Sequence, residues 1–328
     1  MGALSQRALR GWWLIILRWA AALIVLGLLL HFLPVAPLRA AIARVPVSAF
    51  FAVLLGYLLA HCVGVLKWRM VVNAASAELD FATSAQCYAG GLFGTLFLPS
   101  IVGGDVVRLA VGLRRSPRPA AVLTGNLVDR FLDVTAQGGL VLLGLLLAPE
   151  LDLVPDELED KLENGLVVVA IALIVLLGVI FRLRKKILAG RSVRFRRRLG
   201  RLRHAFRSVS KRPGVLVLGW LLGTGIQTCF LLLTAQVAEY CGLKLRLSVW
   251  LFAWPLAKLA AVLPLTQGGI GVREAALVAL LAPFGAPGPL VLAAGLVWEA
   301  VVITGGLVAG AVALTLSRRR DSPLCREG

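Results

Sequence analysis

Long apolar runs separated by short polar segments dominate the sequence. A helix needs roughly 20 apolar residues to cross the hydrocarbon core of a bilayer, and six runs reach or approach that length. These runs cover residues 12–33, 46–66, 119–148, 164–182, 213–238 and 289–316. The first run is too long for the core of a signal peptide, so we interpret it as an anchor helix. The pattern predicts an all-α polytopic membrane protein.

Two further apolar stretches, 81–98 and 247–263, are shorter. Each leads into a loop that contains proline and a glycine pair, and a second short apolar helix follows at 105–113 or 272–284. By length alone, these segments are either complete spans or half-spans.

Composition supports the membrane assignment, because 59% of the residues are hydrophobic and only 16% are charged. The net charge of +18 is local: residues 182–212 hold fourteen Lys or Arg and no acid, which leaves +4 for the rest of the chain. We therefore expect no nucleic-acid partner. The five cysteines are scattered without a CxxC pair, and there are only three histidines, so we expect no disulfide framework, metal site or cofactor.

Loop charge indicates which side of the membrane each segment faces, because short cytoplasmic loops carry the excess of Lys and Arg. The basic loop 182–212 and the tail at 318–320 are placed inside, together with both termini. The acidic loop 149–163, with seven acids against one lysine, is placed outside. The span 46–66 then ends on the cytoplasmic side at Lys67 and Arg69.

The chain must still be inside at Arg114 and Arg115, so the segment between them and Arg69 makes an even number of crossings. We therefore interpret 81–113 as a re-entrant hairpin that enters from the cytoplasm. The same argument makes 247–284 a hairpin that enters from the opposite face.

The two hairpin tips form an internal repeat. Residues 98–108 align without a gap to 263–273, with six identities in eleven positions that include the proline, both glycines and the arginine. Together with the opposite sidedness, this predicts an inverted-topology repeat, an architecture in which broken helices build a substrate site in transporters. The predicted organisation is a single membrane domain over 1–328, and its parts are an anchor (1–45), a first repeat (46–148), a connecting region (149–212), a second repeat (213–316) and a cytoplasmic tail (317–328).

The residues at the tips favour anion binding. Proline ends the incoming helix, paired glycines permit a turn with positive φ, and the next helix presents unpaired N–H groups at its positive end. Arg108 and Arg273 follow one turn later, where a guanidinium offers two parallel hydrogen bonds to a phosphate. The alternatives are arginines that snorkel to the headgroups, and local ion pairs with Asp105 and Glu274. The tip residues are Pro99, Gly103, Gly104, Asp105, Arg108, Pro264, Gly268, Gly269, Arg273 and Glu274.

A third charged group lies inside the run 119–148. Asp129 and Asp133 are four residues apart and share a helix face, with Arg130 beside them. Glu299 occupies the corresponding run of the second repeat. Charged residues inside a span face the bundle interior or a water-filled path, so these residues are either part of a substrate site or polar contacts between helices.

The basic loop carries Leu199, Leu202, Phe206 and Val209 at helical spacing among arginines. This pattern predicts an amphipathic helix on the anionic inner leaflet. A solvated loop that only sets topology is the alternative.

The motifs LPSIVGGDVVR (98–108), VDRFLD (128–133) and LPLTQGGIGVREAAL (263–277) resemble the lysylphosphatidylglycerol synthetase transmembrane domain family, which is also described as flippase-like. The resemblance covers about residues 45–316. It implies translocation of a lipid, or a related lipid-handling role, and by motif it implicates the residues of both tips together with Asp129 and Arg130. The chain stops at Gly328 without the soluble domain of the bifunctional members, so we do not expect aminoacyl transfer.

Three functions remain open at this point. The first is a flippase of the plasma (bacterial inner) membrane that moves an anionic lipid, such as a phospholipid or a polyprenyl-phosphate-linked lipid, and is not an enzyme. The second is an intramembrane lipid-modifying enzyme that uses Asp105, Asp129 or Asp133 as acid or base. The third is a lipid-binding scaffold that holds a lipid-synthesis enzyme. The lipid, the coupling ion and the oligomeric state are not evident from the sequence.

Overall fold

The computed structural model describes residues 23–24, 27–28, 35–98, 103–147, 193–261, 266 and 269–321. Within these ranges the chain is helical and contains no strand. The elements in chain order are α2 (Val35–Ala43), α3 (Val47–Ala74), α4 (Phe81–Thr95), α5 (Gly103–Arg115), α6 (Pro119–Leu147), α8 (Val193–Ser210), α9 (Pro213–Tyr240), α10 (Leu247–Ala260), α11 (Val272–Leu281), the 3-10 helix η2 (Ala282–Phe284) and α12 (Gly288–Asp321). Most of the predicted run 12–33, all of 164–182 and the acidic loop 149–163 lie outside the described residues.

Four helices, α3, α6, α9 and α12, are long and apolar enough to cross a membrane. At 1.5 Å per residue, the 28 residues of α3 extend about 42 Å, which exceeds the roughly 30 Å hydrocarbon core. The predicted all-α membrane protein is therefore confirmed in its class. Four of the six predicted spans are present with nearly the expected ends, although α3 continues to Ala74 instead of ending at residue 66.

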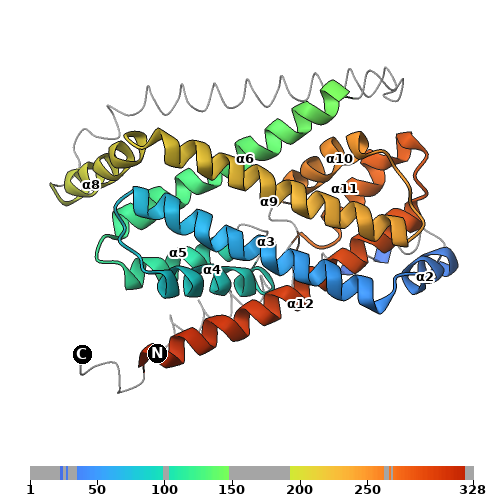
Figure 1. Cartoon of the computed structure of the whole chain (residues 1–328), viewed down its shortest axis with the longest axis horizontal. Helices are drawn as coiled ribbons and strands as arrows, with labels where there is room; N and C mark the ends of the chain where they lie inside the picture. The colour runs from blue at the N-terminus through green and yellow to red at the C-terminus, as the bar shows by residue number, and fades with distance from the viewer. Residues whose placement is uncertain are drawn as a thin grey trace, which may run out of the picture.

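The four described helices at the predicted hairpins are too short to cross. α4, α5, α10 and α11 have 15, 13, 14 and 10 residues, against the roughly 20 that a span requires. They coincide closely with the short apolar stretches of the sequence. Figure 1 shows α4 and α5 near one end of the long helices and α10 and α11 near the opposite end.

Helix boundaries follow from local chemistry. α6 begins with Pro119, which suits a position where no backbone N–H is needed. The Ser116 hydroxyl just before it accepts the backbone N–H of Arg118 (3.1 Å) and donates to the Ala77 carbonyl (2.9 Å), which ties the turn after α3 to the start of α6. α9 begins with Pro213 in the same way, and Gly242 follows its end with φ +93.

Helix packing has a regular relation between the two halves of the chain. α3 packs against α9, α4 packs against α12, and α10 packs against α6. The first helix of each half follows the same rule: α2 packs against α12, the last helix of the second half, and α8 packs against α6, the last helix of the first half. Exchanging α2–α6 with α8–α12 therefore leaves these packing partners unchanged.

The glycine pairs act differently at the two tips. Positive φ was expected at both pairs, and this is wrong for Gly103 and Gly104, which open α5 in ordinary helical geometry. Gly104 instead permits close approach, since a Cβ there would lie 2.5 Å from the Gly91 carbonyl oxygen on α4. Gly269 does have a positive φ of +81. Pro99, Pro264 and Gly268 lie outside the described residues.

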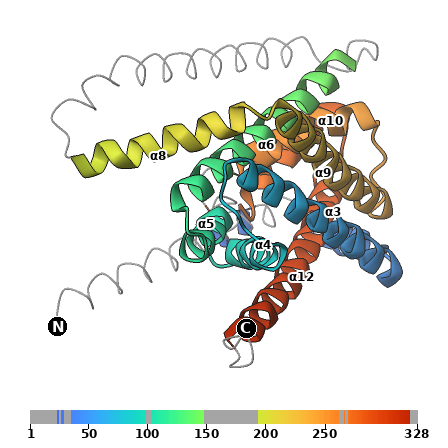
Figure 2. The same cartoon turned by 60° about the vertical axis from the view of Figure 1, so that its left-hand side comes forward.

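The basic amphipathic helix is present as α8, which packs along α6 and extends past the long helices (Figure 2). Its inner face consists of Ala205 and Val209, and Ser208 donates a hydrogen bond to the Ala74 carbonyl at 3.0 Å. Phe206, which the spacing assigned to this apolar face, is 59% exposed instead. The side chain of Leu199 is outside the described part of α8.

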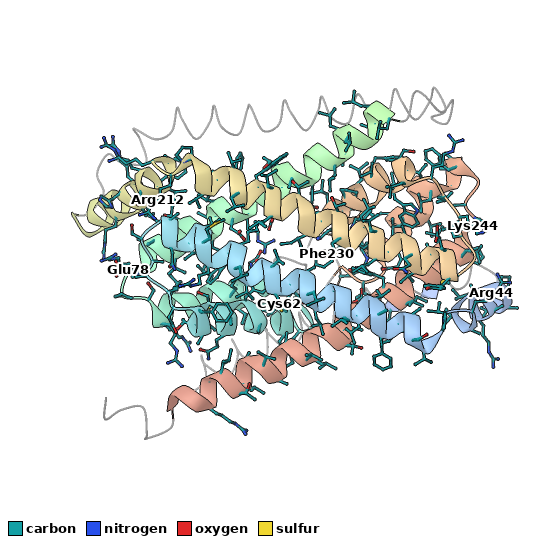
Figure 3. All side chains as sticks on the ribbon, viewed as in Figure 1. Arg44, Cys62, Glu78, Arg212, Phe230 and Lys244 are labelled. Carbon is teal, nitrogen blue, oxygen red and sulfur yellow. The ribbon has the colours of Figure 1, made fainter. Side chains whose placement is uncertain are left out.

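The exposed charged side chains of the described residues lie toward the two ends of the bundle, and exposed apolar side chains cover the middle (Figure 3). Glu78 and Arg212 lie at one end, Arg44 and Lys244 lie at the other, and Phe230 lies between them. Large apolar side chains such as Leu55 and Leu59 on α3 and Leu146 on α6 are more than half exposed. This distribution is the one that a lipid environment requires.

Candidate functional site

A buried lysine joins α3 to the two aspartates of α6. Lys67 Nζ lies 2.8 Å from Asp129 Oδ1 and 2.5 Å from Asp133 Oδ1. The sequence placed Lys67 at the cytoplasmic surface, and this is wrong. Because α3 continues to Ala74, Lys67 sits about two turns inside the helix and is 3% exposed.

Asp105 at the start of α5 pairs across to α6 instead of along its own helix. Its Oδ1 lies 2.6 Å from Arg130 Nη2, but 3.7 Å from Arg108 Nη1. Arg130 also approaches Asp133 Oδ2 at 3.5 Å. Asp105 therefore pairs mainly with Arg130, and the expected ion pair between Asp105 and Arg108 is long and weak.

Arg108 is buried but weakly paired. Its nearest carboxylate oxygens, on Asp105 and Asp129, are 3.7 and 3.9 Å away, beyond hydrogen-bond length. Its Nε has no hydrogen-bond partner among the described residues. The guanidinium lies over the Tyr88 ring, with Cζ 4.0 Å from the ring centroid, and this contact orients it without occupying its N–H groups. Within the part of the chain that the structure describes, Arg108 therefore keeps its Nε–H free for a ligand.

Arg273, the equivalent residue of the second tip, is held by two glutamates. Its Nη2 lies 2.6 Å from Glu274 Oε1 and 2.6 Å from Glu299 Oε2, and its Nε donates to Glu274 Oε1 at 3.0 Å. The Gly271 backbone N–H donates to the other Glu274 oxygen at 2.7 Å. Here the expected local ion pair is present, and Glu299 joins it from α12.

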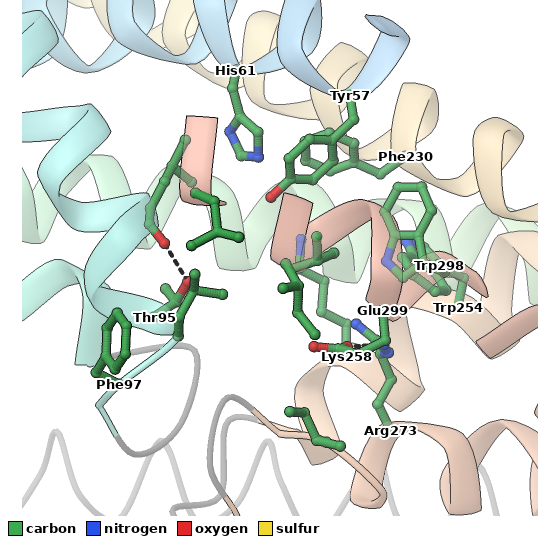
Figure 4. A pocket seen from close by; sticks show the side chains of 16 residues that line it. Tyr57, His61, Thr95, Phe97, Phe230, Trp254, Lys258, Arg273, Trp298 and Glu299 are labelled. Carbon is green, nitrogen blue, oxygen red and sulfur yellow. Dashed lines mark hydrogen bonds and ion pairs between the residues drawn. The ribbon is translucent and has the colours of Figure 1, made fainter. Parts of the chain in front are cut away.

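Two cavities adjoin these clusters. One, of about 350 Å³, is lined by residues that include Lys67, Arg108 and Arg130. The other, of about 320 Å³, is lined by Arg273, Glu299 and several aromatic rings. Figure 4 shows the second cavity, with Tyr57, Phe230, Trp254 and Trp298 around it. We name them the Arg108 cavity and the Arg273 cavity.

The two cavities share five wall residues: His61, Leu92, Thr95, Phe230 and Lys258. Lys258 Nζ donates to Gln227 Oε1 at 2.7 Å and has no carboxylate partner among the described residues. The two predicted tip arginines thus line neighbouring cavities that meet at Lys258.

The predicted site residues that the structure describes lie around the two cavities. Six of them line the Arg108 cavity: Gly104, Asp105, Arg108, Asp129, Arg130 and Asp133. Arg273 and Glu299 line the Arg273 cavity. The other three do not line either cavity: Gly103 is the first residue of α5, Glu274 binds Arg273, and Gly269 lies against Ala261.

Three residues of the site were missed in the sequence. From the sequence, Lys67 is a lysine at the end of a span, and Tyr88 does not stand out. Lys258 is either a polar partner within the second repeat or a buried polar residue satisfied by backbone. The available signal was a charge inside an apolar run: a lysine there is costly unless it is paired or lines a cavity.

The sequence of the chain matches the model of one family of membrane proteins over most of its length. The model of the lysylphosphatidylglycerol synthase TM region matches residues 15–310. The chain belongs to this family. None of the curated proteins compared with the chain matches it.

Membership of the lysylphosphatidylglycerol synthase TM region family confirms the resemblance inferred from the three motifs. The matched range includes all three motifs and both cavities. The chain is therefore an integral membrane protein of a family named for its lipid chemistry.

Proposed function

We propose that this protein translocates an anionic lipid, such as a phospholipid or a polyprenyl-phosphate-linked lipid, between the leaflets of the plasma (bacterial inner) membrane. The observation that carries the proposal is the Arg108 guanidinium, which lines a cavity inside a membrane protein and whose Nε–H has no hydrogen-bond partner among the described residues. A phosphate oxygen accepts such donors with charge-assisted hydrogen bonds. The phosphate would bind between Arg108 and Arg130.

The lipid chains would leave the headgroup through the wall between α4 and α12. The Arg273 cavity is lined there by Phe97, Ile303 and Leu307, which are about 40–50% exposed on the lipid-facing surface. An apolar wall beside a polar cavity suits a molecule that has one charged end and one apolar end.

The mechanism we propose rests on an inverted repeat. The exchangeable packing of α2–α6 and α8–α12, with the short pairs at opposite ends of the bundle, supports two re-entrant pairs that enter from opposite faces. Movement of one pair against α3 and α9 would expose the cavities to each side in turn. Arg212, Arg118 and the arginines of α8 favour a cytoplasmic position for that end, with both termini inside and α8 on the anionic leaflet.

Translocation requires no covalent change, so we propose that the chain is not an enzyme. All three candidate acids of the alternative enzyme are paired with cations. Asp129 and Asp133 bind Lys67, and Asp105 binds Arg130. A scaffold that holds a lipid-synthesis enzyme through α8 is the other alternative. Only a flippase changes which leaflet a lipid occupies when the purified protein is the sole protein present.

The test uses the purified chain in vesicles that contain phosphatidylglycerol with a fluorescent acyl chain, and a membrane-impermeant quencher reports the outer leaflet. We expect the wild type to make nearly all of the label accessible, whereas protein-free vesicles protect half. Failure of the wild type to do so overturns the proposal.

Arg108→Ala tests the headgroup site. Charge-assisted hydrogen bonds contribute about 1.5–3 kcal/mol, so we expect the rate to fall about tenfold to a hundredfold. The ion pairs Asp105–Arg130 and Asp129–Lys67 do not involve Arg108 and remain in this variant, so we expect it to fold. Arg108→Lys should recover only part of the rate, because the planar fork is lost. Arg203→Ala, an exposed position on α8, is the matched control and should behave as the wild type.

A further inference from the structure

The charges around the two cavities sum to zero when the cavities are empty. The described residues contribute five cations and five anions: Lys67, Arg108, Arg130, Lys258 and Arg273 against Asp105, Asp129, Asp133, Glu274 and Glu299. Uncompensated charge inside a membrane is costly, and the observed balance avoids that cost.

The balance is uneven between the two clusters. Around Arg108, the three cations Lys67, Arg108 and Arg130 offset three aspartates. Around Arg273, one guanidinium faces two glutamates, so this cluster carries one excess negative charge. Lys258, in the wall that both cavities share, supplies the missing positive charge.

A bound lipid monoanion disturbs this balance by one unit. With the phosphate in the Arg108 cavity, the ten groups and the ligand sum to −1. Lys258 is the one cation of the set without a carboxylate partner in the described chain, and it is therefore free to turn toward the phosphate. The Arg273 cluster then loses its balancing charge.

Glu299 is the carboxylate best placed to take up a proton in response. Glu274 is held by the Gly271 N–H and by two nitrogens of Arg273, whereas Glu299 contacts only Arg273 Nη2 among the described residues. Glu299 also lines the Arg273 cavity, which gives water access to it.

The other titratable groups that face this cavity are Tyr57 and His61 of α3, Lys258 of α10 and Arg273 of α11. None of the described cavity residues of α4 or α9 is titratable. Among the described residues, Glu299 is therefore the one acid that lines the Arg273 cavity.

We infer that the protein co-transports one proton with each lipid monoanion, and that Glu299 carries the proton. On binding, a proton from the aqueous phase forms an O–H bond with the Glu299 carboxylate, while Arg273 stays on Glu274. On release at the other face, that bond breaks and the proton leaves with the lipid. The inference rests on the proposed translocation and adds its driving force.

The charge sum predicts which gradient drives transport. One monoanion and one proton cross together without net charge, so a pH gradient should drive transport and a membrane potential should not. At equilibrium, each pH unit should enrich the lipid about tenfold in the leaflet on the alkaline side.

The experiment uses the same vesicles with fluorescent phosphatidylglycerol and an imposed gradient of one pH unit. In the wild type we expect the leaflet ratio to shift several-fold toward the alkaline side, to collapse when a potassium–proton exchanger removes the gradient, and to ignore a potassium diffusion potential. Glu299→Gln should still equilibrate the lipid, more slowly than the wild type because release is slower, and its final leaflet ratio should no longer respond to the gradient. Glu239→Gln, at an exposed position of α9, is the matched control and should respond as the wild type.

The outcomes separate the two proposals. A wild type that moves no lipid defeats the translocation proposal. A wild type that equilibrates lipid but ignores the gradient defeats only the coupling, and a Glu299→Gln variant that still follows the gradient removes Glu299 as the carrier. Should that variant not fold, calorimetry on the wild type decides. Dihexanoyl phosphatidylglycerol, titrated in two buffers of different ionisation enthalpy, should bind with uptake of about one proton, and no uptake overturns the inference.

Discussion

Lys67→Met tests whether the buried charges hold the helices together as paired groups. Methionine has a similar length without the charge, so the change removes the cation that lies between Asp129 and Asp133. The two carboxylates then face each other four residues apart on α6. Their remaining partners are weak, since Arg130 is 3.5 Å from Asp133 and Arg108 is 3.9 Å from Asp129.

The expected loss is large because Lys67 is only 3% exposed. Removing one partner of a buried ion pair costs about 3–5 kcal/mol. At about 2 °C per kcal/mol for a large domain, the unfolding temperature should fall by about 6–10 °C. The double variant Lys67→Met, Asp133→Asn restores the charge balance and should recover more than half of this loss.

Thermal unfolding in detergent, followed by tryptophan fluorescence, measures the change, and Trp68 gives a buried reporter beside the altered residue. Lys244→Met, at an exposed lysine outside the buried clusters, is the control and should shift the midpoint by about 1 °C or less. If Lys67→Met also melts within 1 °C of the wild type, the pairing contributes no net stability. The charge-balance reasoning would then lose its basis.

Three further predictions concern glycine positions and sidedness. Gly269→Ala should cost about 1–3 kcal/mol, because φ is +81 and the new Cβ would lie 2.7 Å from the Ala261 Cβ; thermal unfolding measures this. Gly104→Ala should cost a similar amount by separating α4 from α5, whereas Gly138→Ala, with nothing within 4 Å, should stabilise by up to about 1 kcal/mol. In a background without native cysteines, Glu78→Cys should react with an impermeant thiol reagent only from the cytoplasmic side and Lys244→Cys only from the other side; labelling of both from one side would refute the orientation.

The sequence predicted the long helices well because span length and loop charge are local properties. The starts at Pro119 and Pro213 follow directly from the proline itself. The end of α3 was misplaced because Lys67 reads as a surface residue when its partners are unknown. Those partners, Asp129 and Asp133, are more than 60 residues away, and a single sequence does not bring them together.

The sequence singled out most of the charged residues that line the two cavities, but it did not predict how they pair. The shared motif at 98–108 and 263–273 suggested two equivalent arginines. The second motif continues into Glu274, where the first has Leu109, and this difference decides the pairing. The identity of the carboxylate that holds each arginine depends on the crossing of α5 with α6 and of α11 with α12, and so it follows from the packing of the helices.

The unequal pairing of the two arginines bears on how a lipid would be released. Two equally free arginines would bind an anion with equal strength at both stages of translocation, and transport needs binding that is strong enough for entry and weak enough for exit. Arg108 has an unpartnered Nε, whereas Arg273 is occupied by Glu274 and Glu299. An anion near Arg273 would have to compete with two carboxylates already in place. The proposed path therefore runs from one strong position at Arg108 to a weak one, and Glu299→Gln, which removes one competitor, should slow release as well as uncouple the proton.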